Sequence, residues 1–122
     1  MADIHCSSEH GIDMIQIQGV LTDDDLIKIS QLITTLRQQN STKLLILGNA
    51  VERIAVKQWR LLDTATRNFR QLGGVIALAE FKDSHLKMMR YPSWFQYVNT
   101  FKSKQEAVLF LDPHTIDGLN MV

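Results

Sequence analysis

The residues best suited to nucleophilic chemistry are at the start of the chain. Cys6 is the only cysteine, and His5 directly precedes it. Neighbouring residues on a strand point to opposite faces, so His5 is badly placed to act as a base for the thiol. We therefore interpret Cys6 as an inert or mildly reactive thiol rather than a nucleophile. With one cysteine, no internal disulfide can form.

The histidines do not indicate a metal site. No two of them are three or four residues apart, the spacing that lets two imidazoles on a helix face one ion. Motifs for a serine nucleophile elbow, a phosphate loop and a dinucleotide fingerprint are absent as well. We predict that the protein is not an enzyme and carries no metal or other cofactor. The histidines are His5, His10, His85 and His114.

Three consecutive carboxylates, Asp23, Asp24 and Asp25, follow Thr22. They could bind a metal or take part in phosphate chemistry, or they could stabilise the start of a helix. Thr22 is a good N-cap, and the helix dipole favours negative charge in the first turn. Asp25 stands where a capping box places Glu or Gln. We favour stabilisation of the helix start.

A second set of polar side chains recurs at intervals of three and four residues and shares one face of a predicted helix over Ala55–Leu72. Arginine pairs well with carboxylates and phosphates, so such a strip suggests an acidic partner surface or an anion. The alternative is an ordinary solvated helix face. The strip consists of Lys57, Arg60, Thr64, Arg67 and Gln71, with Arg53 just before the helix.

The overall composition narrows the function classes further. The chain has 122 residues, which predicts one domain, over residues 1–112, with a flexible tail over residues 113–122. Basic and acidic residues number 13 each, whereas a general nucleic-acid or membrane-surface binder is expected to carry more positive charge. Apolar runs of four or five residues are far short of the roughly 18 needed to span a membrane. No secretory signal is visible, so we expect a cytoplasmic protein without membrane insertion.

The hydrophobic pattern predicts alternating strands and helices in the order β-β-α-β-α-β-α-β-α. Such an order indicates an α/β domain with a mixed, mostly parallel sheet of about five strands and about four helices. Ligands of such sheets bind at the carboxyl ends of the strands, which here directs attention to the loop expected after Leu47. The predicted strands are Ile4–Ser7, Ile12–Val20, Lys43–Leu47, Val75–Ala79 and Tyr97–Phe101.

The helices are predicted from apolar stripes and caps. The first begins at Thr22 and ends near Asn40. The third begins at Asp83 or Ser84, and the last is capped by Ser103. The stripe of the first helix consists of Leu26, Ile29, Ile33 and Leu36, widened by Ile27 and Leu32.

With its landmarks, this order resembles the STAS domain, named for sulfate transporters and anti-sigma factor antagonists. Ile17–Thr22 looks like the strand that ends in Gly-x-Leu before the first helix. Leu44–Leu47 looks like the strand before the second helix, and Arg70–Leu78 like the helix end, glycine pair and next strand. Phe101–Val108 looks like the closing strand and Glu-Ala helix. The resemblance covers about residues 4–112.

The phosphorylation motif of bacterial anti-sigma factor antagonists is missing. The family typically has Asp-Leu at the end of the third strand and Asp-Ser-Ser/Ala-Gly at the start of the second helix. Here Leu47-Gly48 and Ala55-Val56-Lys57-Gln58 occupy these positions. No Ser, Thr or Tyr occurs from Lys43 to Asp63. Phosphorylation, which can make or break a docked interface, is therefore not expected at this loop.

The resemblance implies a regulatory module that binds a protein, either an anti-sigma factor or a related serine kinase. It places the partner surface on the second helix and the segment leading into it. Pairing with a second copy, and binding of a nucleotide, an anion or a lipid, stay open as alternatives. The residues expected to contact the partner are Asn49, Arg53, Ala55, Val56, Lys57, Arg60, Thr64 and Arg67.

Overall fold

The computed structural model describes residues 2–89 and 98–113. Within them a five-stranded sheet has the order β1-β2-β3-β4-β5, with β1 antiparallel to β2 and the other neighbours parallel. This confirms the predicted mixed α/β sheet. The elements in chain order are β1 (Asp3–Glu9), β2 (Ile12–Val20), α1 (Asp23–Gln38), β3 (Lys43–Arg53), α2 (Val56–Gln71), β4 (Val75–Ala79), α3 (Asp83–Leu86), a 3₁₀ turn (Lys87–Met89), β5 (Asn99–Phe101) and α4 (Lys104–Leu111).

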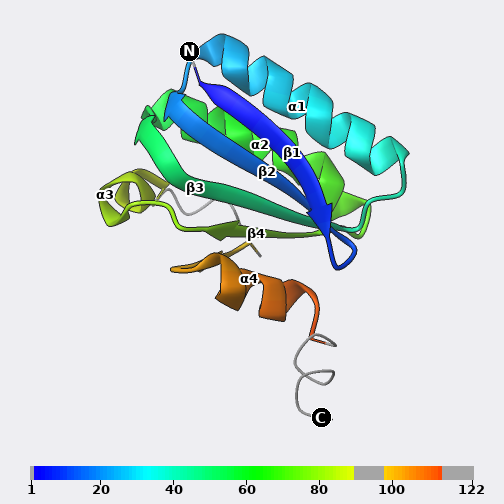
Figure 1. The fold of residues 1–122 in the computed structure, drawn as a ribbon. Coiled ribbons are helices and arrows are strands. Elements are labelled where there is room, and N and C mark those ends of the chain that lie inside the picture. The colour runs from blue at the N-terminus through cyan, green and yellow to red at the C-terminus, as the bar shows by residue number, and fades with distance from the viewer. Residues whose placement is uncertain (1, 90–97, 114–122) are drawn as a thin grey trace.

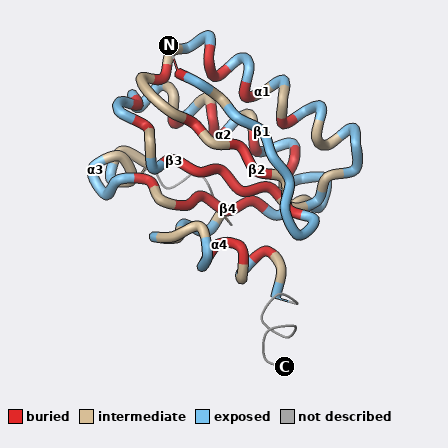
Figure 2. The backbone as a smooth tube through the Cα atoms, in the orientation of Figure 1, coloured by how far each residue is buried: buried red, intermediate tan, exposed pale blue. Residues whose placement is uncertain are grey.

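The sheet separates two apolar layers (Figure 1). Helices α1 and α2 lie on one face and pack on side chains such as Ile15, Ile46 and Leu78. Helix α4 lies on the other face, where it packs on the set that contains Met14 and Leu45. Burial of both faces explains the continuous apolar runs Leu44–Leu47 in β3 and Val75–Ala79 in β4, and Figure 2 shows these strands in the buried centre of the fold.

The β1–β2 hairpin turns at His10 and Gly11. Both residues have positive φ angles, 54° and 73°. Two such residues in succession are typical of the hairpin turn whose twist matches that of the flanking strands. A tight turn therefore joins β1 and β2.

The start of α1 confirms the helix-capping interpretation of the three aspartates. The Thr22 hydroxyl accepts a hydrogen bond from the Asp25 N–H at 3.3 Å, and the Asp25 carboxylate accepts from the Thr22 N–H at 2.9 Å. Asp25 is fully buried and also accepts from the Ala2 N–H at 3.0 Å. The carboxylate therefore ties the beginning of β1 to the beginning of α1.

Two details of the expected pattern are wrong. Ile27, assigned to the apolar stripe of α1, is 57% exposed, because it lies on the outer side of the helix. Strand β3 does not end at Leu47 but continues to Arg53. It does so because Val51 and Ile54 are buried in the α1/α2 layer, and because β2 pairs with β3 as far as Val20 and Arg53.

The described residues that follow β4 form short elements. Residues 83–89 form one α-turn and one 3₁₀ turn rather than a longer helix. The predicted start of the last strand at Tyr97 and the predicted tail from His114 lie outside the described residues. In the part of the chain that is described, no helix is both long and apolar enough to cross a membrane.

Candidate functional site

The candidate site is the corner where β3 passes into α2. Because β3 extends to Arg53, only Ile54 and Ala55 connect it to the helix. Ala55 is the N-cap and has no side-chain acceptor, so Gln58 supplies part of the cap by accepting a hydrogen bond from the Ala55 N–H at 2.8 Å. The Gln58 side chain also donates to the Leu21 carbonyl at 3.0 Å. The corner is thus fixed to the segment between β2 and α1.

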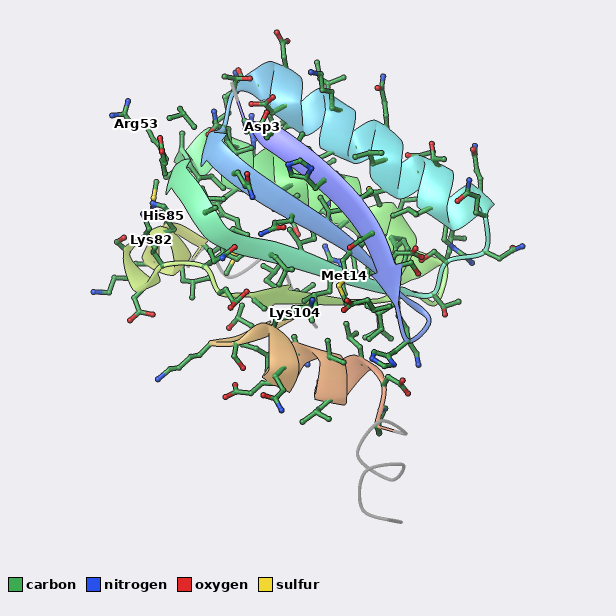
Figure 3. The ribbon with its side chains drawn as sticks, viewed as in Figure 1. Asp3, Met14, Arg53, Lys82, His85 and Lys104 are labelled. Carbon is green, nitrogen blue, oxygen red and sulfur yellow. The ribbon has the colours of Figure 1, made fainter. Side chains whose placement is uncertain are left out.

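All eight residues predicted to contact a partner are exposed or partly exposed. Figure 3 shows Arg53 pointing away from the body of the protein at the carboxyl end of β3. Val56 is 40% exposed, which leaves it available for contact. Arg60, Thr64 and Arg67 follow along the outer face of α2.

Asn49 is separated from the other predicted residues by the sheet. Its side-chain oxygen accepts a hydrogen bond from Gln16 at 3.5 Å. Gln16 pairs with Leu47, whose side chain belongs to the apolar layer under α4. Asn49 therefore lies on the α4 side of the sheet, whereas the α2 strip faces solvent on the opposite side.

Two cations of the predicted strip already have partners within the chain. Lys57 Nζ lies 2.9 Å from Asp23 Oδ2, joining the first turns of α2 and α1. The hydrogen bond from Lys57 holds the pKa of Asp23 below its usual value. Arg67 lies 2.6 Å from Asp63, one helical turn before it. The strip is therefore less positive than the sequence suggests.

Arg53 and Arg60 remain as exposed cations that form no ion pair with any described residue. The first turn of α2 contains no acidic residue, in contrast to that of α1. The partial positive charge of the helix N-terminus adds to that of the arginines. This combination makes the corner attractive to an acidic group on a partner.

An aromatic pair packs in the buried layer next to the corner. The rings of Trp59 and Phe81 are 5.1 Å apart and inclined by 51°. Phe81 packs so closely on Gly48 that a Cβ atom there would overlap its ring. Sequence reasoning missed Phe81, because no periodic pattern connects a residue after β4 with the middle of β3.

The described residues offer no cluster of three or more His, Cys, Asp or Glu that could hold a metal ion. At the corner itself, the segment from Lys43 to Asp63 has no hydroxyl group that could accept a phosphate. What the corner offers is hydrogen bonding, charge and a small apolar surface. These properties suit recognition of another molecule.

No protein-family model and no curated protein matches this chain. Solved structures do match it. A serine-to-glutamate variant of RsbS from Moorella thermoacetica has a TM-score of 0.74 at 16% identity and covers 93% of this chain and 97% of its own. The phosphorylated Bacillus cell fate determinant SpoIIAA has a TM-score of 0.69 at 14% identity, covering 87% and 96%. An anti-sigma factor antagonist from Mycobacterium paratuberculosis has a TM-score of 0.69 at 13% identity, covering 91% and 94%.

At these identities the likeness establishes the fold. It covers almost the whole chain and almost the whole of each matched structure. The chain therefore has the STAS-like α/β fold of these proteins, which confirms the resemblance found in its sequence.

Proposed function

We propose that this STAS-fold domain is a cytoplasmic, non-enzymatic regulator that binds an anti-sigma factor or a related serine kinase. It docks through the β3–α2 corner and the outer face of α2. Because no hydroxyl is present from Lys43 to Asp63, binding at this corner is not switched by phosphorylation. The fold shared with SpoIIAA and with the mycobacterial anti-sigma factor antagonist supports an anti-sigma factor or a related kinase as the proposed class of partner.

The observation that carries the proposal is the pair of exposed arginines at the corner. Arg53 and Arg60 have no internal ion-pair partner among the described residues, and they flank the N-terminus of α2. Long charged side chains that are not used within the fold are available to steer an acidic partner into place. Arg67 is a poorer candidate for this role because it is paired with Asp63.

The test uses an anti-sigma factor or serine kinase encoded beside this gene, with association measured by surface plasmon resonance. We expect Arg53→Glu and Arg60→Glu each to slow association, by about tenfold at low salt, and to reduce its dependence on salt. Lys28→Glu is the matched control, because Lys28 is an exposed cation on α1 near Ile4, away from α2. Equal association rates for all three variants and the parent would contradict the proposal.

Phosphorylation is tested separately. We expect binding to be unchanged after the domain is incubated with the kinase and ATP, with no phosphate found in residues 48–60 by mass spectrometry. Loss of binding together with a phosphate in that segment would overturn the proposed lack of phospho-control. Strong thermal stabilisation by a nucleotide, and none by the protein partner, would instead favour a ligand-binding module.

A further inference from the structure

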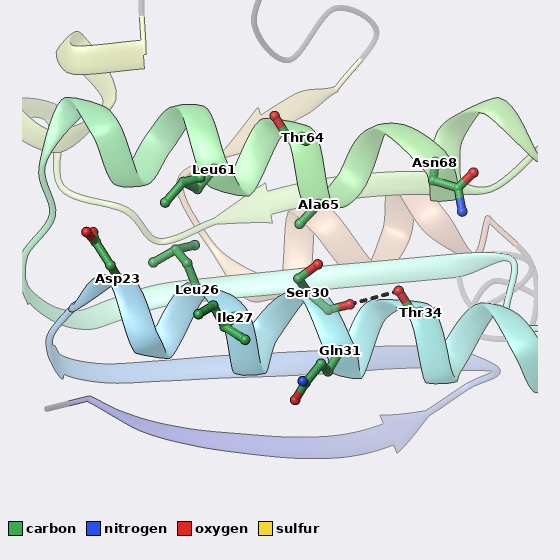
Figure 4. A pocket seen from close by; sticks show the side chains of 10 residues that line it. All are labelled: Asp23, Leu26, Ile27, Ser30, Gln31, Thr34, Leu61, Thr64, Ala65 and Asn68. Atoms are coloured by element: carbon green, nitrogen blue, oxygen red, sulfur yellow. Dashed lines mark hydrogen bonds between the residues drawn. The ribbon is translucent and has the colours of Figure 1, made fainter.

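A groove of about 360 Å³ runs between the outer faces of α1 and α2. Its lining combines apolar and small polar side chains, with Leu26, Leu61 and Ala65 among the apolar ones. Figure 4 shows Leu26 and Leu61 turned toward each other between the two helices. Ile27, more than half exposed, stands on the α1 side, and the hydroxyl of Thr64 lies on the α2 side.

One end of the groove lining is Asp23 on α1, whose carboxylate pairs with Lys57 on α2 and so connects the two helices. From there the lining extends along α1 from Asp23 to Thr34. The first and last of these twelve helical residues are separated by eleven rises of about 1.5 Å, which corresponds to about 16 Å, or about three turns of a helix.

We propose that this groove binds one amphipathic helix of a protein partner, about three turns long, with acidic residues along the flank that faces α2. The combination of an exposed large apolar side chain, a row of smaller apolar side chains and polar edges is typical of helix-in-groove recognition. In that mode the apolar side chains at positions i, i+3, i+4 and i+7 of the bound helix enter the groove.

The charges on the two sides determine which flank of the bound helix is acidic. On α2, Arg60 lies one turn before Thr64, is exposed and forms no ion pair with any described residue, whereas Arg67, one turn after Thr64, is already paired with Asp63. On α1, Asp23 and Asp24 are negative, and Ile27 and Gln31 are uncharged. A carboxylate on the α2 flank is attracted, whereas one near the start of α1 is repelled.

This inference rests on the proposed function, because it gives the form of the partner that the β3–α2 corner recognises. The two surfaces share Thr64, and Lys57 of the corner pairs with Asp23 of the groove lining, so one partner can cover both. They differ at Arg53, which lies only at the corner, and at Ile27, which lies only at the groove. Variants at these two positions separate the failure of one idea from the failure of the other.

The test titrates ¹⁵N-labelled protein with two synthetic helical peptides. Both carry leucines at the same i, i+3, i+4 and i+7 positions, and one flank has glutamates in one peptide and lysines in the other. We expect the glutamate peptide to shift the amide signals of Ile27, Ser30, Thr64 and Ala65 and to bind about fivefold more tightly than the lysine peptide. Arg60→Glu should reverse this order, and Lys28→Glu should leave it unchanged.

Ile27→Gln should weaken the binding of both peptides by about tenfold. It should not lower the melting temperature, because the isoleucine is exposed in the free protein. Equal affinity of the two peptides, shifts elsewhere on the domain, or no shifts at about 1 mM peptide would each overturn the proposal. A dimer in sedimentation experiments that Ile27→Gln dissociates would assign the groove to a second copy, and would overturn it too.

The natural partner then separates the two proposals. If Arg53→Glu weakens binding of the natural partner and Ile27→Gln does not, the groove proposal fails and the proposed function stands. If the peptides bind the groove as expected but no anti-sigma factor or kinase binds the domain, the proposed function fails and the groove stands as a helix-binding surface.

Discussion

The carboxylate of Asp63, in the middle of α2, lies 2.8 Å from the guanidinium of Arg70. Asp63 is 1% exposed and Arg70 15% exposed, so the ion pair is largely removed from water. Arg67 approaches the other carboxylate oxygen from the surface. One buried acid thus fixes two arginines, of which Arg67 was predicted to contact a partner.

Replacing Asp63 with Asn should destabilise the domain by about 2–3 kcal/mol. The loss is large because Arg70 would keep its charge in a poorly solvated position. Removing one partner of a buried ion pair costs more free energy of folding than the intact pair contributes. Urea denaturation followed by circular dichroism measures the change. Arg67→Gln is the control and should cost less than about 1 kcal/mol, because Arg67 is half exposed. Equal losses in the two variants would contradict this assignment.

Gly48→Ala should destabilise the domain by about 1–3 kcal/mol, because the added methyl group overlaps the ring of Phe81 and forces the packing against Trp59 to shift. The same substitution in a Phe81→Leu background should cost less, since the smaller side chain leaves room for the methyl group. A double-mutant cycle from urea denaturation tests this coupling. If the losses of unfolding free energy are additive, Phe81 is not the residue that opposes the added methyl group.

Stability should fall as the pH drops below about 4, partly because of Asp25. Burial alone raises the pKa of Asp25, but hydrogen bonds from Ala2 and Thr22 outweigh it, so the pKa lies below its ordinary value. A carboxyl group whose pKa is lower in the folded state stabilises above its unfolded pKa. That contribution is lost as the pH falls through the folded value.

We therefore expect Asp25→Ala to be less stable than the parent at pH 7, by about 1–3 kcal/mol, and to lose less stability between pH 5 and pH 2. Unfolding free energies at several pH values provide the measurement. A parallel decline in both proteins would mean that Asp25 does not contribute to the acid sensitivity.

Cys6 should react slowly with alkylating agents although it is exposed. Burial of part of the thiol and the negative charge of Asp13 both raise its pKa, which lowers the fraction of reactive thiolate. Alkylation by iodoacetamide at pH 8, followed by mass spectrometry, should be slower than for a cysteine in an unfolded peptide. Asp13→Asn should accelerate it modestly, and a rate unaffected by this change would remove Asp13 as a cause.

The order of the elements and the mixed sheet could be predicted from the sequence because the periodic patterns that specify them are local. The alternation in β2 and the cap at Thr22 are local patterns of this kind. The length of β3 was not predictable in this way. Its apolar run ends at Gly48, which resembles a strand end until Phe81, more than thirty residues later, is seen to fill the space above it.

The same distinction applies to the candidate site. The exposure of Arg60 and Thr64 follows from their spacing on α2. The Arg67–Asp63 pair could have been recognised from its i, i+4 spacing, whereas the Lys57–Asp23 pair joins residues 34 positions apart. The α1–α2 groove left no signal in the sequence, because Ile27 has the same residue type as the buried members of its helix.

The two-residue link from β3 to α2 has an energetic consequence for association. A binding surface carried on a long loop must be ordered when a partner arrives, and each immobilised side chain or residue subtracts from the affinity. Here the backbone up to Arg53 is already part of a sheet ladder, and Gln58 fastens the start of the helix. Association at this corner therefore carries a small entropic penalty, and even a modest contact area can yield a useful dissociation constant.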